Sequence, residues 1–220
     1  MKEALSRRLF SEALATALLL ATVVGSGIMA EKLASGNDAV ALLGNTLATG
    51  AILPVLITIF GPVSGAHMNP AVSFGACYLR DLAWRDLLFI VTAQIIGAII
   101  GVLCAHLMFE LPLLQVSEKL RVGPAQMFSE FIATFGLILT ILGTSRRAPA
   151  FTPAAVGLYI TAAYWFTAST SFANPAVTIA RALTNTFAGI APSGVMPFIA
   201  VQMLGLFVGL WAARILWPQK

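Results

Sequence analysis

Six long stretches of this chain contain no Asp, Glu, Lys or Arg. They are residues 13–30, 39–79, 87–109, 131–145, 148–180 and 182–213. About 20 apolar residues cross a hydrocarbon core as a helix, and in lipid only helices and closed barrels satisfy their own backbone hydrogen bonds. Over the whole chain 59% of residues are hydrophobic and 10% charged, against roughly a quarter charged in a soluble domain. We therefore expect residues 1–220 to form a single all-α membrane domain, and we do not expect a soluble enzyme.

Two of the uncharged runs have lengths that fit neither one membrane crossing nor two. Residues 39–79 and 148–180 number 41 and 33, so each run has room for one full helix and about half of another. Late in each run the same tripeptide occurs, as Asn69-Pro70-Ala71 and as Asn174-Pro175-Ala176. Asn as the N-cap followed by Pro at the first helical position is a helix-start signal. Each tripeptide therefore predicts a half helix that begins inside the membrane.

The two halves of the chain share further elements in the same order. Phe-Ser-Glu at 10–12 recurs at 128–130, and the pair Gln94 and Gly97 recurs as Gln202 and Gly205. This indicates a duplication with repeats at about 1–114 and 120–220. Because three crossings separate the two half helices, these must enter from opposite faces. The sequence predicts six transmembrane helices plus two reentrant half helices in an inverted repeat.

The basic residues predict the orientation of this topology. With the N-terminus inside, nine of the 13 Lys and Arg residues, among them Lys2 and Lys220, fall on the cytoplasmic side. Cytoplasmic loops carry an excess of basic residues. We expect a multi-pass protein of the cell (inner) membrane with both termini in the cytoplasm. The same distribution explains the net charge of +4 without a nucleic-acid partner.

The starts of the two half helices indicate a chemistry. The first backbone N–H groups of a helix lack partners and have a partial positive charge, and lipid cannot satisfy them. They must therefore line a polar cavity, into which Asn69 and Asn174 can each turn a side-chain NH₂. A solute with lone pairs is favoured there, whereas a cation meets two positive helix ends.

The chain resembles the aquaporin, or major intrinsic protein, family. The resemblance covers nearly all of the chain and rests on the string SGAHMNPAVS at 64–73, the second Asn-Pro-Ala, the Glu/Thr pairs and AQIIGA at 93–98. It implies the aquaporin fold, a pore in every protomer of a homotetramer embedded in membrane lipid, and passive transport of water or small neutral solutes. It implies no enzymatic activity and no cofactor or metal.

The resemblance also assigns a selectivity filter by counting from the two Asn residues. The four positions are Thr49, Ala162, Ser171 and Val177. None is aromatic or charged, and Val177 stands where the family usually has an Arg. These features are similar to those of aquaglyceroporin-like bacterial members that pass glycerol or uncharged metalloid acids such as arsenous acid, including members associated with arsenic. We expect the pore to admit solutes larger than water.

The remaining polar candidates each allow two interpretations. Arg181 lies one helical turn after Val177, as a cation of the outer vestibule or as a side chain that snorkels or contacts a loop. Glu12 and Glu130 either brace the loops before the half helices, as the family implies, or transfer protons. His67 is expected to brace a loop or organise the carbonyls of the lumen, with a titrating gate as the alternative.

Three functions follow from these interpretations. The first is a passive channel for glycerol or uncharged metalloid acids, with water. The second is a channel that also admits small anions such as arsenate. The third is a proton-coupled secondary transporter with inverted repeats, in which Glu12 or Glu130 carries the proton.

Overall fold

The computed structural model describes residues 3–218, so Lys2 and Lys220, which were used to predict the orientation, lie outside the described residues. The described chain forms six long α-helices, two short ones and one 3₁₀ turn. The long helices are α1 (Leu5–Leu33), α2 (Asp38–Ser64), α4 (Trp84–Met108), α5 (Pro124–Arg147), α6 (Thr152–Phe166) and α8 (Pro192–Leu216). The short ones are α3 (Pro70–Tyr78) and α7 (Pro175–Arg181). The predicted all-α fold of six long and two half helices is confirmed.

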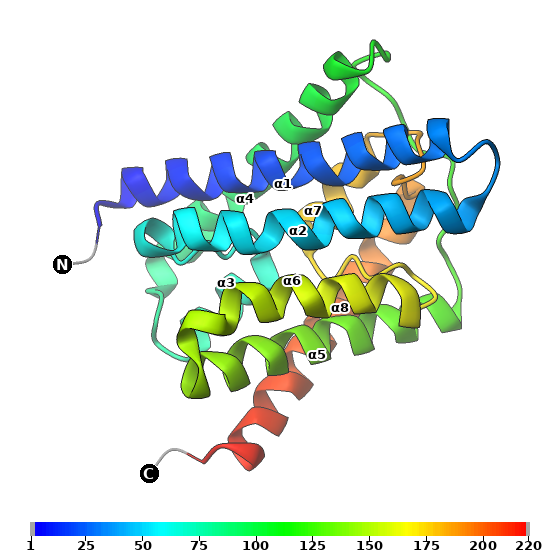
Figure 1. The fold of residues 1–220 in the computed structure, drawn as a ribbon. Helices are drawn as coiled ribbons and strands as arrows, with labels where there is room; N and C mark the ends of the chain where they lie inside the picture. Colours follow the sequence, from blue (N-terminus) through cyan, green and yellow to red (C-terminus); the bar gives the residue numbers. More distant parts are fainter. Residues whose placement is uncertain (1–2, 219–220) are drawn as a thin grey trace.

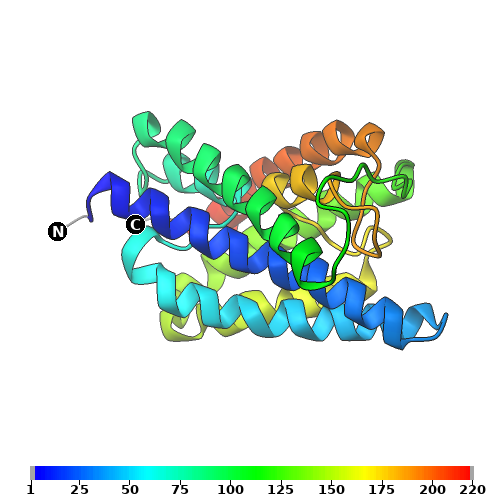
Figure 2. The same cartoon turned by 90° about the horizontal axis from the view of Figure 1, so that it is seen from above.

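The long helices run back and forth between two ends of one bundle (Figures 1 and 2). The start of α1 and the end of α8 lie at the same end of this bundle. Five of the long helices are long and apolar enough to cross a membrane. The sixth, α6, has only 15 residues, and the 3₁₀ turn Pro149–Phe151 precedes it directly. Large apolar side chains such as Leu47, Leu88 and Trp211 are exposed on the outside, as a lipid-facing surface requires.

The short helices begin in the interior of the bundle at the two predicted prolines (Figure 1). Helix α3 leads through residues 79–83 to the start of α4, at the end of the bundle where α1 also begins. Helix α7 leads through residues 182–191 to the start of α8, at the opposite end. The two half helices therefore run outward from the middle in opposite directions, which is the inverted arrangement that the sequence predicts.

Glycines at corresponding places allow close helix crossings in both halves. Helix α1 packs against α4, and α5 packs against α8. A Cβ atom added at Gly97 of α4 would overlap the carbonyl oxygen of Ala13, and one added at Gly205 of α8 would overlap that of Phe131. Small residues let membrane helices approach closely. These two crossings bring the polar side chains of α1, α4, α5 and α8 next to the half helices.

Candidate pore

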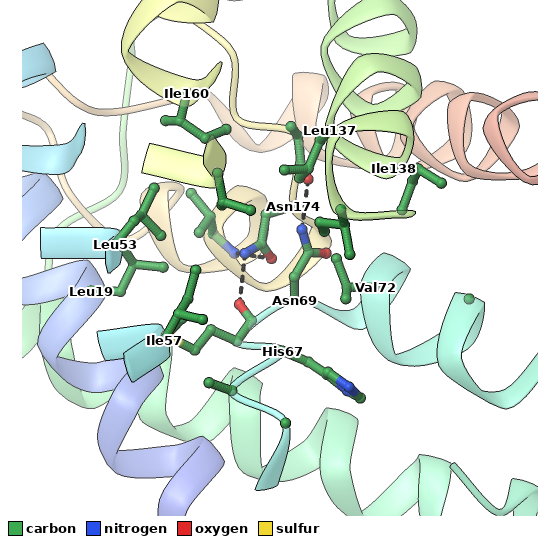
Figure 3. Close-up of a pocket in the computed structure, with 18 of the residues that line it drawn as sticks. Leu19, Leu53, Ile57, His67, Asn69, Val72, Leu137, Ile138, Ile160 and Asn174 are labelled. Carbon is green, nitrogen blue, oxygen red and sulfur yellow. Dashed lines mark hydrogen bonds between the residues drawn. The ribbon is translucent and has the colours of Figure 1, made fainter. Parts of the chain in front are cut away.

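A cavity of about 310 Å³ lies between the long helices and the loops before α3 and α7. Most of its lining is apolar, and Figure 3 shows these side chains around Asn69 and Asn174. The apolar residues include Leu19, Leu53, Ile57, Leu137, Ile138 and Ile160. The polar ones include Thr49, His67, Asn69, Tyr164, Ser171, Asn174 and Arg181. A passage with apolar walls and a few polar groups holds a solute weakly enough to release it.

Asn69 and Asn174 act as N-caps of the two half helices and also bind each other's loop. The Oδ1 of Asn69 accepts a hydrogen bond from Ala71 N at 3.0 Å, and its Nδ2 donates to the carbonyl oxygen of Ala173 at 2.8 Å. The Oδ1 of Asn174 accepts from Ala176 N at 3.0 Å, and its Nδ2 donates to Met68 O at 2.7 Å (Figure 3). Each amide NH₂ has two hydrogens, so one remains for a solute in the cavity that both residues line.

The backbone before each Asn adopts an unusual conformation. Ala66 and Met68 precede Asn69 by three and one residues and have φ of 47° and 49°, and Ser171 and Ala173 precede Asn174 by the same steps with φ of 50° and 47°. The left-handed region costs a non-glycine residue roughly 1–2 kcal/mol. Such strain persists only where the surroundings fix the conformation. Two buried glutamates supply this constraint.

Glu12 lies fully buried on α1 and holds the first loop. Its carboxylate accepts hydrogen bonds from His67 N at 2.9 Å and from Met68 N at 2.8 Å. It also accepts from the Ser64 hydroxyl at 2.7 Å and from Gln94 Nε2 at 2.7 Å. The carboxylate therefore has four donors, and it is not among the groups that line the cavity.

Glu130 occupies the corresponding place on α5. It accepts from Phe172 N and Ala173 N, both at 2.8 Å, and from Gln202 Nε2 at 2.7 Å. Gln202 donates further to the Thr178 hydroxyl at 2.9 Å, as Gln94 does to the Ser73 hydroxyl at 2.9 Å. The repeated Glu and Gln residues of the sequence thus form the same hydrogen-bonded frame twice. The sequence alone does not predict the role of the two glutamines, although it shows their recurrence.

His67 stands at the edge of the cavity. Its backbone N–H binds Glu12, and its ring Nδ1 lies 3.1 Å from the Ser73 hydroxyl. Figure 3 shows the ring pointing away from the two Asn side chains. Both contacts tie the loop to Glu12 and α3.

The structure corrects one of the four filter residues. Thr49, Ser171 and Val177 line the cavity, but Ala162 does not and is exposed on the outside of α6. Tyr164 lines the cavity instead, and its hydroxyl donates to the Thr49 hydroxyl at 3.3 Å. Tyr164 precedes Asn174 by ten residues, so the connection is two residues shorter than the counting assumed. Two residues turn a helix by about 200°, which moves Ala162 to the opposite face. Of the four counted positions, Ala162 is therefore replaced on the cavity wall by the aromatic side chain of Tyr164.

Arg181 does not snorkel. The side chain is 2% exposed. Its Nε donates to the carbonyl oxygen of Ala188, and its guanidinium carbon lies 3.4 Å from the ring centroid of Phe172. It lines the same cavity as Val177. The loop contact that the sequence allows is therefore present. The side chain also lies on the cavity wall, as the interpretation as a vestibule cation requires.

A second buried arginine, which the sequence did not single out, holds the outer loops together. Arg121 donates from Nε to Gly189 O at 2.8 Å and from Nη2 to Phe187 O at 3.2 Å, on the segment that also binds Arg181. Burial lowers the pKa of the neighbouring Lys119, and the charge of Arg121 lowers it further. The ion pairs among residues 3–218 include neither Arg121 nor Arg181. This end of the molecule therefore has buried positive charge that no carboxylate pairs directly within residues 3–218. Carboxylates bind the same segments, because Glu31 accepts from Phe187 N at 3.2 Å and Glu130 accepts from Phe172 N at 2.8 Å.

Comparisons with known proteins agree with this geometry. A family model described as Major intrinsic protein matches residues 1–171. The chain is 56% identical over 210 residues to Aquaglyceroporin AqpS of Rhizobium meliloti (strain 1021), which covers 96% of this chain and 90% of the relative. The chain belongs to the major intrinsic protein family. As a member, it is a multi-pass membrane protein and a passive channel for water and small neutral solutes such as glycerol.

Three further similar proteins share a lower percentage of identical residues with this chain. Aquaporin NIP2-1 of Oryza sativa subsp. japonica is 30% identical over 220 residues, covering 94% of this chain and 69% of the relative. The Glycerol uptake facilitator protein of Bacillus subtilis (strain 168) is 36% identical over 117 residues, or 46% of this chain and 42% of the relative. The X-ray structure of the aquaglyceroporin from Plasmodium falciparum superposes with a TM-score of 0.76 at 20% identity, covering 98% of both chains. That likeness shows the fold.

Proposed function

We propose that this major intrinsic protein passes small neutral polyhydroxylated solutes, namely glycerol and uncharged metalloid acids such as arsenous acid, together with water. The proposal depends on Val177, which lines the cavity where the family usually has an Arg. An Arg there fills the passage with a planar group of five donors. Val177, Thr49 and Ser171 are smaller and leave room for a three-oxygen solute.

The expected class of solute follows from the mixture of apolar and polar groups that line the cavity. Leu53, Ile57, Leu137 and Ile160 offer apolar surface, whereas Asn69 and Asn174 each offer a free amide hydrogen. A polyol or an undissociated oxyacid presents oxygens to one wall and less polar surface to the other. An ion would lose its hydration shell against largely apolar walls without a replacement.

Stopped-flow measurements on proteoliposomes test the proposal. Water, glycerol, arsenous acid and arsenate are each applied as a gradient to vesicles with equal amounts of reconstituted protein. We expect water, glycerol and arsenous acid to cross faster than in protein-free vesicles. A protein that conducts water and excludes glycerol, arsenous acid or both would contradict the proposal.

Proton-coupled transport has less support. Glu12 and Glu130 are fully buried, and each carboxylate receives at least three hydrogen bonds from loops and glutamines. Among the described residues that line the cavity, Asp81 is the only acidic one. We therefore assign bracing to Glu12, Glu130 and His67, and we expect flux without dependence on a proton gradient. Accumulation of solute above equilibrium under such a gradient would overturn this assignment.

Conduction of small anions such as arsenate is the second candidate. One observation favours it, because Arg121 and Arg181 are buried and neither forms an ion pair within the described residues. Buried positive charge that no carboxylate pairs directly attracts anions to the vestibule. The arsenate arm of the same experiment tests this function directly.

We propose that the chain forms a homotetramer in the cell (inner) membrane, with both termini in the cytoplasm. The distribution of basic residues along the sequence supports the orientation. Size-exclusion chromatography with light scattering in detergent tests the assembly, and cysteine accessibility at the ends of the chain tests the orientation.

A further inference from the structure

The guanidinium of Arg181 is buried with most of its hydrogen-bonding capacity unused. Its Nε donates to Ala188 O. Its Nη1 is buried, and neither Nη1 nor Nη2 has a hydrogen-bond partner among the described residues. A buried charged donor without an acceptor is costly. The cavity that Arg181 lines is the place where an acceptor can reach these N–H groups.

A second residue of the same cavity also has an unpaired polar group. The hydroxyl of Ser171 is buried, lacks a partner within residues 3–218, and belongs to a residue that lines the same cavity. Ser171 directly precedes Phe172, on whose ring the Arg181 guanidinium lies at 3.4 Å. The two unpaired groups therefore belong to residues of one cavity wall that are both joined to Phe172, Ser171 through the chain and Arg181 through contact with the ring.

The position of both groups is fixed by the fold. Glu130 holds the backbone of Phe172 and Ala173. The ring of Phe172 packs edge-on against Phe198 of α8, with centroids 5.4 Å apart. Arg121 fixes the segment that contains Ala188. A donor held in place in this way loses little freedom when it binds an oxygen.

We infer that Arg181 and Ser171 form an oxygen-binding subsite that replaces the missing filter Arg from one turn further along α7. Its ligand is a neutral molecule with two neighbouring hydroxyls, either a vicinal diol or an oxyacid with several hydroxyls on one centre. Arg181 donates to one oxygen, and the Ser171 hydroxyl donates to or accepts from the other. Val177 provides the width, and Arg181 provides the hydrogen bonds. This inference rests on the proposed passage of neutral polyhydroxylated solutes and names the residues that select them.

Two substitutions test the subsite through the ratio of glycerol to water permeability in proteoliposomes. Arg181→Met keeps a long side chain on Phe172 and removes the donors, and Ser171→Ala removes only a hydroxyl. A hydrogen bond to a charged group contributes more than one between neutral groups. We expect the ratio to fall about tenfold in Arg181→Met and about threefold to fivefold in Ser171→Ala. The double variant should fall by less than the product, because both groups bind one solute.

The chain offers matched controls. Arg146 lies over the ring of Trp217 at 5.6 Å, much as Arg181 lies over Phe172, but it does not line the cavity. The Ser129 hydroxyl accepts from Ala168 N and also lies outside the cavity. Arg146→Met and Ser129→Ala should therefore leave the ratio within about twofold of the parent. Arg181→Lys keeps the charge without the planar fork, and we expect it to recover only part of the ratio.

The outcomes separate this inference from the function on which it rests. A parent protein that passes no glycerol would refute the proposed function. A parent that passes glycerol, with an unchanged ratio in reconstituted Arg181→Met and Ser171→Ala, would refute the subsite alone. If Arg181→Met yields no folded protein, Ser171→Ala decides by itself, since a ratio equal to that of Ser129→Ala overturns the inference.

Discussion

The two half pores, residues 64–78 and 167–181, hold their loop backbones with the same pair of Glu and Gln side chains. They differ in the other polar side chains that surround these loops. In both, a buried Glu binds the two N–H groups before the Asn, and a Gln links that Glu to a hydroxyl on the half helix. The first half pore adds Ser64 and His67 to this frame. The second adds Arg181, stacked on Phe172. The duplicated part holds the pore open, and we assign solute selection to the part that differs.

Substituting a large residue for Gly97 or Gly205 should destabilise the two halves of the molecule equally. This is the largest effect that we expect from any of the substitutions. Leu at Gly97 or at Gly205 would drive a side chain into the backbone of the facing helix, α1 or α5. Helices forced apart lose the Gln–Glu hydrogen bonds that these crossings permit. We expect a loss of stability of about 3 kcal/mol or more in each variant. Thermal unfolding in detergent measures it, and a large difference between the two variants would contradict the equivalence of the halves.

Replacing the two buried glutamates by glutamine should destabilise the two halves to different extents. In Glu12→Gln or Glu130→Gln one oxygen becomes an NH₂ and leaves a backbone N–H unpaired, at a cost of about 1–3 kcal/mol. Both loops keep a local tie, because Ala66 N donates to the Ser64 hydroxyl at 3.1 Å and Ser171 N donates to the Ser169 hydroxyl at 3.2 Å. Only the first tie reaches another helix within the described residues, because Ser64 also accepts from the Ser11 hydroxyl of α1 at 3.0 Å, whereas the Ser169 hydroxyl donates to Thr167 nearby in the chain. We therefore expect Glu130→Gln to lower the unfolding temperature more than Glu12→Gln does. The reverse order would show that Ser64 does not support the loop without the carboxylate.

The cap residues differ by one hydrogen bond. Asn69 accepts from Ala71 N alone, whereas Asn174 accepts from Ala176 N and from Val177 N at 3.3 Å. Replacing either by Ala removes a cap contribution of about 1 kcal/mol and a donor in the lumen. Yield and glycerol flux should fall in both variants, and further in Asn174→Ala. Parent-like flux and yield in both would refute the role assigned to the two Asn residues.

The sequence predicts those parts of the pore that depend on a short local motif or on a motif that occurs in both halves of the chain. The helix starts are local, since Asn-Pro fixes the cap and the first turn by itself. The sequence also indicates Glu12 and Glu130, because their surroundings recur. The place of Ala162 was not predictable by counting, since a connection two residues shorter rotates the helix face by about 200°. The burial of Arg181 has no local signal either, because it depends on Phe172 and on a carbonyl of a later loop.

Val177→Arg restores the residue that the family usually has at this position and tests the difference between the two half pores. Of the substitutions considered, it should have the smallest effect on the fold. The new guanidinium would stand one turn before Arg181 on the same face of α7. Two cations so close repel each other, and the longer side chain narrows the passage beside Thr49 and Tyr164. We expect glycerol and arsenous acid permeability to fall more than water permeability, because single-file water passes a gap that a three-oxygen solute cannot.

Val177→Leu separates width from charge, since it narrows the passage without adding a donor. If width alone sets selectivity, Val177→Leu should lower the ratio of glycerol to water permeability nearly as much as Val177→Arg does. If the hydrogen bonds of Arg181 matter as inferred, Val177→Arg should lower it further, because repulsion would displace the Arg181 guanidinium from the cavity wall. The double variant Arg181→Met with Val177→Arg tests whether repulsion causes this displacement. It has a single guanidinium, at the position where the family usually has an Arg, so no second cation repels it. An unchanged ratio in all three variants at equal reconstitution would show that neither position selects the solute, and the difference between the two half pores would then need another explanation.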